Sequence, residues 1–173
     1  MKWLSEFLKQ ANTSNLKTAH YLKEYGTFKM KVSFGQGVSA RVPWISFYAD
    51  GMSTSNGYYP VYLYFRDVKT LVLSYGVSET NDFGKSWRDD ILDGADQIKN
   101  VIENPPRYGD SWIFKSYQID GDGDAFSLSS NGKKVEDYEL EQDLKEILNR
   151  FSINLDDSLT QKDSPLSAGL FFM

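Results

Sequence analysis

Four short runs of apolar and aromatic residues follow one another in the first half of the chain. They cover Phe28 to Phe34, Val42 to Tyr48, Tyr58 to Phe65 and Thr70 to Tyr75. Gly, Asn, Ser or Asp residues bound each run, which is typical of strands joined by turns. The pattern therefore predicts four consecutive antiparallel strands that form the core sheet.

The alternation of side chains within these runs predicts which faces of the sheet are buried. In the first run, apolar side chains alternate with Lys29 and Lys31, so one face of that strand is expected to be apolar and the other basic. The third run is apolar or aromatic at nearly every position. A strand there is therefore expected either to be covered on both faces or to line a cavity.

Amphipathic helices and two further strands are expected around this core. Apolar residues recur at helical spacing before and after the four runs, and caps and prolines mark the ends of these segments. The expected helices cover residues 2–11, 14–24, 81–104 and 135–151, and the further strands cover residues 111–119 and 125–128. The fold class is thus α+β, with a curved antiparallel sheet of about four to six strands and amphipathic helices packed on it.

The length of the chain favours a single domain. Its 173 residues are enough for one sizeable core and hardly enough for two. The domain is expected to span residues 1–151, and the polar residues 152–173 are expected to be a linker or disordered tail. The first residues contain no long apolar run, so neither a signal peptide nor a transmembrane helix is expected, and a cytoplasmic location is predicted.

Charge is divided unevenly along the chain, whose net charge is −5. Residues 1–76 hold nine Lys or Arg against four Asp or Glu, whereas residues 77–173 hold ten against twenty. A basic face can bind phosphate locally even in an acidic chain, because salt screens charges farther away than about 10 Å. Nucleic acid is therefore not excluded as a partner, but phosphate contacts alone should give a modest, salt-sensitive affinity.

The residue types exclude several kinds of chemistry. The chain has no cysteine and one histidine, so neither thiolate nor histidine metal clusters are expected. Asp120, Asp122 and Asp124 have the spacing of a calcium loop, but Ala125 and Asn131 stand where such a loop needs Gly and Glu. A plain turn is favoured there, with weak cation binding as the alternative. No phosphate-binding loop for nucleotide hydrolysis occurs, and no cofactor is expected.

Four short strings in the strand region occur together in a known family. They are SFGQG at 33–37, VPWISF at 42–47, SNGYYPVYLYF at 55–65 and LVLSYGVSETN at 71–81. In this order they closely resemble the N-terminal DNA-binding domain of McrB-type methylation-dependent restriction enzymes. The resemblance runs almost without gaps from about Phe28 to Trp87.

The resemblance implies a domain that binds double-stranded DNA, flips a modified cytosine such as 5-methylcytosine out of the duplex and holds it in an aromatic pocket. The matching pocket positions are Trp44, Tyr59 and Leu63. The matching DNA-inserting loop is Gly35, Gln36 and Gly37, where Gln36 replaces a tyrosine of the characterised family member. Contacts with the DNA backbone are expected from Lys29, Lys31, Ser33, Arg41, Lys85 and Arg88.

In that family the domain leads to a GTP-hydrolysing AAA+ motor, which recruits a nuclease partner. This chain contains no motif for either, so a recognition domain without enzymatic activity, monomeric when isolated, is expected. A carbohydrate or small-molecule binding module that uses the same aromatic sheet face is an alternative. A hydrolase built on the Asp-rich second half is a less favoured one, because no nucleophile and base stand at a diagnostic spacing.

Overall fold

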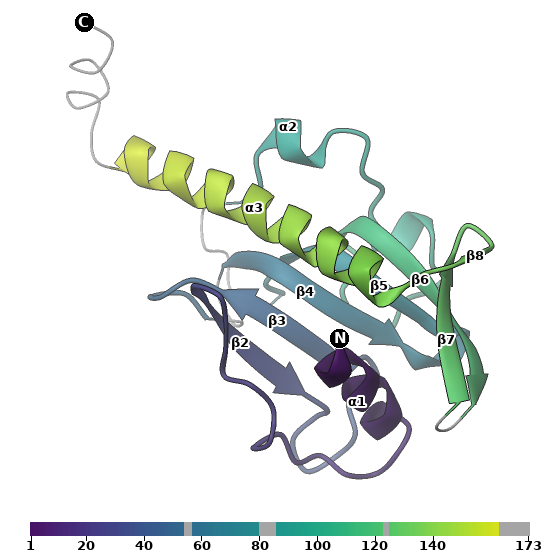
Figure 1. Ribbon diagram of the computed structural model, residues 1–173. Helices are drawn as coiled ribbons and strands as arrows, with labels where there is room; N and C mark the ends of the chain where they lie inside the picture. Colours follow the sequence, from purple (N-terminus) through teal and green to yellow (C-terminus); the bar gives the residue numbers. More distant parts are fainter. Residues whose placement is uncertain (54–56, 80–85, 123–124, 163–173) are drawn as a thin grey trace, which may run out of the picture.

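An eight-stranded antiparallel sheet forms the centre of the computed structural model, which describes residues 1–53, 57–79, 86–122 and 125–162 (Figure 1). Each strand is hydrogen-bonded to the next one along the chain. The strands are β1 (Glu24–Tyr25), β2 (Phe28–Ser33), β3 (Trp44–Tyr48), β4 (Tyr58–Phe65), β5 (Thr70–Val77), β6 (Trp112–Asp122), β7 (Ala125–Ser130) and β8 (Lys133–Lys134). The predicted α+β class is confirmed, and so are the four core strands. The strand count exceeds the prediction of four to six because the two-residue strands β1 and β8 are too short to show a periodic pattern.

One face of the sheet is covered by helices. Figure 1 shows α1 (Lys2–Ala11) and the long α3 (Asp137–Lys162) on the same side of the strands. The ring centroid of Trp3 in α1 lies 6.1 Å from those of Phe47 and Tyr62. The ring of Phe151 in α3 lies 5.8 Å from that of Tyr58. Aromatic packing of this kind adds about 0.5–1.5 kcal/mol per pair to the free energy of apolar burial.

Strand β4 is buried on both of its faces. All eight of its residues are buried, including Tyr62 on the helix-covered face and Tyr59 and Leu63 on the other. The second face is partly covered by the segment that leads into β6, which contributes Tyr108 to the same cavity as Tyr59 and Leu63. The two options predicted for this strand, burial on both faces and a cavity, therefore both occur.

The predicted helix over residues 14–24 is wrong. Most of this segment is exposed and irregular, and it ends in β1. The side-chain amide of Gln10 donates hydrogen bonds to the carbonyl oxygens of Asn15 and Lys17, and the Asn15 side chain accepts one from the Lys17 N–H. These side-chain bonds hold the backbone in a non-helical path.

The predicted helix over residues 81–104 is also wrong. In the described part, only α2 (Asp89–Leu92) and the 3-10 turn η2 (Ile98–Asn100) are helical. Gly94 has a φ of +77°, and the N–H groups of Ile98 and Lys99 donate to the carbonyl oxygens of Ser111 and Gly109. The segment therefore forms only short turns of its own and also bonds to the residues just before β6, which prevents one continuous helix.

Helix α3 begins close to its predicted start and continues to Lys162. The predicted domain boundary at residue 151 thus falls within this helix. Beyond it, Asn154 is only 1% exposed and bonds to the backbone of Ser86 and Arg88. A second 3-10 turn, η1 (Arg66–Val68), joins β4 to β5.

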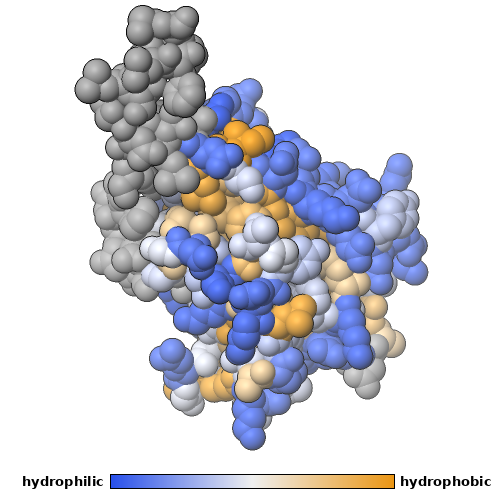
Figure 2. All heavy atoms as spheres, turned by 60° about the vertical axis from the view of Figure 1, so that its left-hand side comes forward, coloured by the Kyte–Doolittle hydropathy of each residue, from blue (hydrophilic) through white to orange (hydrophobic). Residues whose placement is uncertain are grey.

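The surface seen in Figure 2 is largely hydrophilic, with apolar residues showing between the charged ones. Within the described ranges, no helix combines the length and the apolar character needed to cross a membrane. Those ranges also contain no group of three or more His, Cys, Asp or Glu side chains placed to hold a metal ion.

Candidate functional site

A cavity of about 280 Å³ lies on the sheet face opposite the helices. This volume is close to the lower end of small-molecule sites, which run from about 300 to 1,000 Å³. Its lining includes all three predicted pocket residues, Trp44, Tyr59 and Leu63, and two residues of the predicted inserting loop, Gly35 and Gln36. A space of this size suits one flat ring system.

The strand register explains why the pocket residues meet. Trp44 is the first residue of β3 and lies directly opposite Leu63 of β4. Tyr59 lies four residues before Leu63, so both side chains point to the same face because side chains alternate along a strand. Leu63 and Tyr59 are 1% and 7% exposed, whereas Trp44 is half-buried. The inner end of the pocket, at Leu63 and Tyr59, is thus buried, whereas the side formed by Trp44 is partly open to solvent.

Gly76 of β5 lies opposite Tyr59 of β4 in the register. A Cβ atom at position 76 would lie 2.7 Å from Cγ1 of Val61 and 2.8 Å from the backbone oxygen of Tyr59. Both distances are shorter than ordinary contacts. The close approach of β4 and β5 at this point therefore requires glycine.

The loop over residues 34–40 forms one edge of the cavity. It is closed by a 2.8 Å hydrogen bond from the Ala40 N–H to the Phe34 carbonyl oxygen. Gly35 has a φ of +109°, and a Cβ there would lie 2.1 Å from the Val38 carbonyl oxygen, so this turn also requires glycine. Gln36 lines the cavity and is exposed, while Gly37, also exposed, lies outside the lining. The loop thus presents Gln36 at the cavity mouth.

Arg66 ties this loop to the helix-covered side of the molecule. Its Nη1 donates a 2.7 Å hydrogen bond to the carbonyl oxygen of Ala11 at the end of α1. Its Nη2 donates to the carbonyl oxygen of Ala40 at the end of the loop. The planar guanidinium group can hold both acceptors at a fixed distance from each other.

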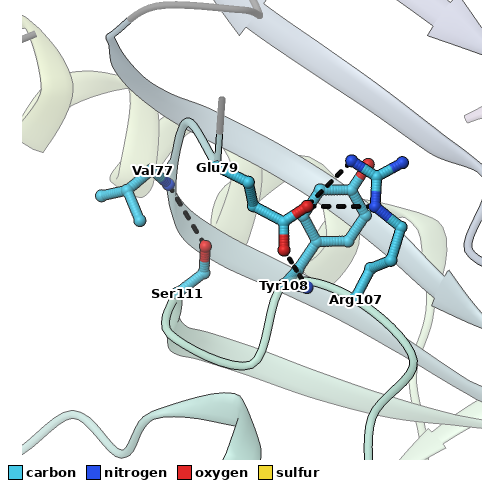
Figure 3. A network of polar contacts seen from close by, with 5 residues as sticks. All are labelled: Val77, Glu79, Arg107, Tyr108 and Ser111. Carbon is cyan, nitrogen blue, oxygen red and sulfur yellow. Dashed lines mark hydrogen bonds and ion pairs between the residues drawn. The ribbon is translucent and has the colours of Figure 1, made fainter. Parts of the chain in front are cut away.

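A network of polar contacts joins five other residues that line the cavity (Figure 3). Oε1 of Glu79 accepts hydrogen bonds from Nε and Nη2 of Arg107 at 3.0 and 2.8 Å, and Oε2 accepts one from the Tyr108 N–H at 2.8 Å. The Ser111 Oγ accepts a 3.2 Å bond from the Val77 N–H. These bonds join the end of β5 to the segment before β6.

Tyr108 is held in an unusual conformation. Its φ of +64° lies in the left-handed region, which is sparsely populated by residues other than glycine. The guanidinium carbon of Arg107 lies 4.6 Å from the centroid of the Tyr108 ring. Burial raises the pKa of the Tyr108 hydroxyl, while Arg107 and a hydrogen bond with the Trp44 side chain act in the opposite direction.

The predicted backbone-contact residues are distributed unequally around this cavity. Ser33 lines it and accepts a hydrogen bond from the Gly35 N–H. Lys31 is exposed, with Nζ 6.0 Å from the centroid of the Trp44 ring, and Arg41 is exposed at the end of the loop. These three residues stand on the side of the cavity formed by β2, β3 and the loop.

Two other predicted contacts, Lys29 and Arg88, do not line the cavity. Lys29 is paired with Glu24 at 3.0 Å and with Asp50 at 3.9 Å, and the hydrogen bond with Glu24 raises the pKa of Lys29. Arg88 pairs with Asp90, and its backbone N–H donates a hydrogen bond to Oδ1 of Asn154, so it lies beside α3. Lys85 lies outside the described residues.

Sequence reasoning missed the Glu79, Arg107, Tyr108 and Ser111 side of the cavity. The segment 105–111 begins with two prolines and has no strand or helix periodicity, so no pattern placed it on the sheet. The one available signal was Glu79, a carboxylate two residues after the apolar run that forms β5.

Comparison with known proteins gives two matches. Residues 2–154 match the family model described as "MrcB-like, N-terminal domain". A protein of Escherichia coli (strain K12), named the type IV methyl-directed restriction enzyme EcoKMcrB subunit, is 34% identical over 126 residues. That alignment covers 68% of this chain and 27% of the relative, so the chain spans about a quarter of the length of the relative.

Proposed function

Because the chain belongs to the family of MrcB-like N-terminal domains, we propose that it is the DNA-recognition domain of a modification-dependent restriction system. Its ligand is double-stranded DNA that carries a modified cytosine, 5-methylcytosine or a similar base. The chain binds this base after it has been flipped out of the duplex. The motor and nuclease activities of such a system belong to other modules.

The observation that carries the proposal is the cavity shared by Trp44, Tyr59 and Leu63. Two aromatic rings and an aliphatic side chain suit a flat, weakly polar base, and the ring of Tyr108 adds a third aromatic surface. Stacking of a base on an aromatic side chain is worth about 1–3 kcal/mol. Two or more such contacts offset the few kcal/mol that unstacking a base costs.

The loop over residues 34–40 supports the same proposed function. Gln36 is exposed at the cavity mouth, and Arg66 fixes the loop behind it. When the base enters the cavity, the glutamine side chain fills part of the gap and hydrogen-bonds to the unpaired guanine. Lys31 and Arg41, both exposed on this side, bind the flanking phosphates.

Selectivity for a modified base comes from the buried end of the cavity. Leu63 is 1% exposed, so a methyl group in contact with it is removed from water. Burial of one such carbon is worth about 0.8 kcal/mol, which corresponds to roughly a fourfold preference over unmodified cytosine. A larger preference requires a close fit around the methyl group.

The direct test is a binding titration with matched duplexes that contain cytosine, 5-methylcytosine or 5-hydroxymethylcytosine, at low and moderate salt. The protein variants are wild type, Trp44→Ala and, as a control, Trp112→Ala, which removes a half-buried tryptophan aligned with Tyr75 on the helix-covered face. Trp44→Ala should weaken binding to the modified duplex by roughly 5- to 150-fold, the range of a lost stacking contact. Its remaining affinity should still fall with rising salt.

Two outcomes would contradict the proposal. In the first, no duplex binds and a carbohydrate or other small molecule does, independently of salt. In the second, Trp44→Ala and Trp112→Ala weaken all duplexes alike, which would make Trp44 a structural residue.

A further inference from the structure

Among the described residues that line the cavity, Glu79 is the acidic one, and hydrogen bonds hold it in place. Three hydrogen bonds from Arg107 and the Tyr108 N–H hold its carboxylate. Its negative charge raises the pKa of both the Tyr59 and Tyr108 hydroxyls, after the larger effect of burial. The carboxylate therefore lies close to the polar ends of two rings that line the cavity.

The carboxylate retains capacity for another donor. Two carboxylate oxygens offer about four acceptor positions. The three hydrogen bonds described for Glu79 use two on Oε1 and one on Oε2. The Glu79 side chain is 38% exposed, so a group that enters the cavity can reach Oε2. An ionised carboxylate accepts hydrogen bonds and donates none.

Cytosine and thymine differ at the position that such an acceptor would read. Cytosine carries an exocyclic amino group, a hydrogen-bond donor, at C4, and thymine carries a carbonyl oxygen there. A carboxylate accepts a hydrogen bond from the first group and repels the second. 5-Methylcytosine and thymine share the methyl group, so contact with Leu63 does not separate them.

We propose that Glu79 reads the exocyclic amino group of the flipped base, and thereby makes the cavity specific for cytosines over thymine. Arg107 is a positioning residue that holds the carboxylate, as Figure 3 shows. The inference rests on the proposed function, because it requires a base in the cavity.

The test compares 5-methylcytosine with thymine, each opposite an abasic site. Neither base has a pairing partner in this context, so a difference in flipping cost does not mask a difference in recognition. Wild type should bind the 5-methylcytosine duplex about tenfold or more tightly, in keeping with a specific hydrogen bond to a base edge. In Glu79→Gln the preference should fall to near one, because an amide can turn either its oxygen or its NH2 group toward the base.

A second variant separates recognition of the base by Glu79 from the support that Arg107 gives to the Glu79 carboxylate. Arg107→Gln removes the cation and keeps the carboxylate, so it should weaken both duplexes while 5-methylcytosine stays preferred. The inference is overturned if Glu79→Gln keeps the wild-type preference, or if wild type binds both duplexes equally while Trp44→Ala weakens both. The second result would contradict the role of Glu79 but not the proposal that the cavity binds a flipped base. If Trp44→Ala has no effect on either duplex, the proposed function fails and the role of Glu79 fails with it.

Discussion

At the scale of single residues, the cavity depends both on the side chains that line it and on the glycines that allow the backbone to approach closely beside it. Trp44, Tyr59 and Leu63 could be identified from the sequence because they match pocket positions of a family that the chain resembles. The apolar pattern alone does not distinguish pocket residues from ordinary core residues. Glu79 and Tyr108 could not be found in this way. Their places depend on the path of the segment before β6, which is set by hydrogen bonds between groups far apart in the sequence.

Gly76 offers a test at this scale. Gly76→Ala puts a methyl group against the backbone of Tyr59, so we expect overpacking to lower the free energy of unfolding by about 1–3 kcal/mol. Affinity for a modified duplex should fall as well, because a shift of the Tyr59 backbone moves the ring that lines the cavity. Urea unfolding and the binding titration measure the two effects.

The control for Gly76 is Gly132→Ala. Gly132 has a φ of +77° and no atom within 4 Å of an added Cβ, so the change strains the backbone far from the cavity. It should lower stability by about 1 kcal/mol and leave DNA binding unchanged. Equal loss of binding in both variants would show that the Gly76 effect is general destabilisation.

At the scale of elements, the strands followed from local alternation, and α1 and the start of α3 followed from helical spacing. The two wrong helices share one physical cause. In each segment hydrogen bonds from outside the predicted helix, such as those from the Gln10 amide to the carbonyl oxygens of Asn15 and Lys17, take up groups that helical bonds would use. Sequence periodicity records which residues are apolar, and it contains no information about such distant partners.

The loop that presents Gln36 should depend on Arg66. Arg66→Lys replaces a planar fork with a single ammonium group, which cannot hold the carbonyl oxygens of Ala11 and Ala40 in the same fixed geometry. Backbone amides of residues 35–41 should exchange hydrogen faster, and affinity for a modified duplex should fall several-fold.

Arg150→Lys is the matched control for this change. Arg150 bonds to the Tyr75 hydroxyl and to Glu146, away from the loop. Its replacement should lower stability without altering exchange in residues 35–41. If Arg66→Lys leaves both exchange and affinity at wild-type values, Arg66 does not position the loop.

The part of α3 beyond residue 151 should contribute to stability through Asn154. Asn154→Ala leaves the Arg88 N–H and the Ser86 carbonyl oxygen without this partner, at a cost of about 1–3 kcal/mol if water does not replace it. Ile153→Ala, at a neighbouring position that is 44% exposed, should cost much less. Thermal or urea unfolding of the two variants would show whether residues past 151 belong to the folded domain; equal, small effects would place them outside it.

At the scale of the whole molecule, the sheet divides the chain into a face covered by helices and a face that holds the cavity. Tyrosines on both faces are buried, and this has a consequence for the dependence of stability on pH. Burial raises the pKa of Tyr62 well above its ordinary value of 10, and burial followed by the charge of Glu6 raises the pKa of Tyr21 to about 12. Burial likewise raises the pKa of Tyr75 and Tyr117.

The folded chain therefore holds these protons more tightly than the unfolded chain does. The free energy of unfolding should be insensitive to this effect below about pH 10, where tyrosine is protonated in both states, and should fall as the pH rises above it. Urea unfolding at several pH values, together with tyrosinate absorbance, measures this fall. Tyr62→Phe should make it less steep. A free energy that stays constant beyond pH 10 would contradict the prediction.

The central claim, that the cavity receives a base flipped out of the duplex, is tested most directly by varying the base opposite 5-methylcytosine. A flipped base must first lose its partner, so affinity should rise by about tenfold or more when guanine is replaced by adenine, thymine or an abasic site. Trp44→Ala should lose this gain, because the vacated base then has no ring to stack on. If affinity stays the same or falls for all three replacements in wild type, the base is read within the duplex and the cavity does not hold it.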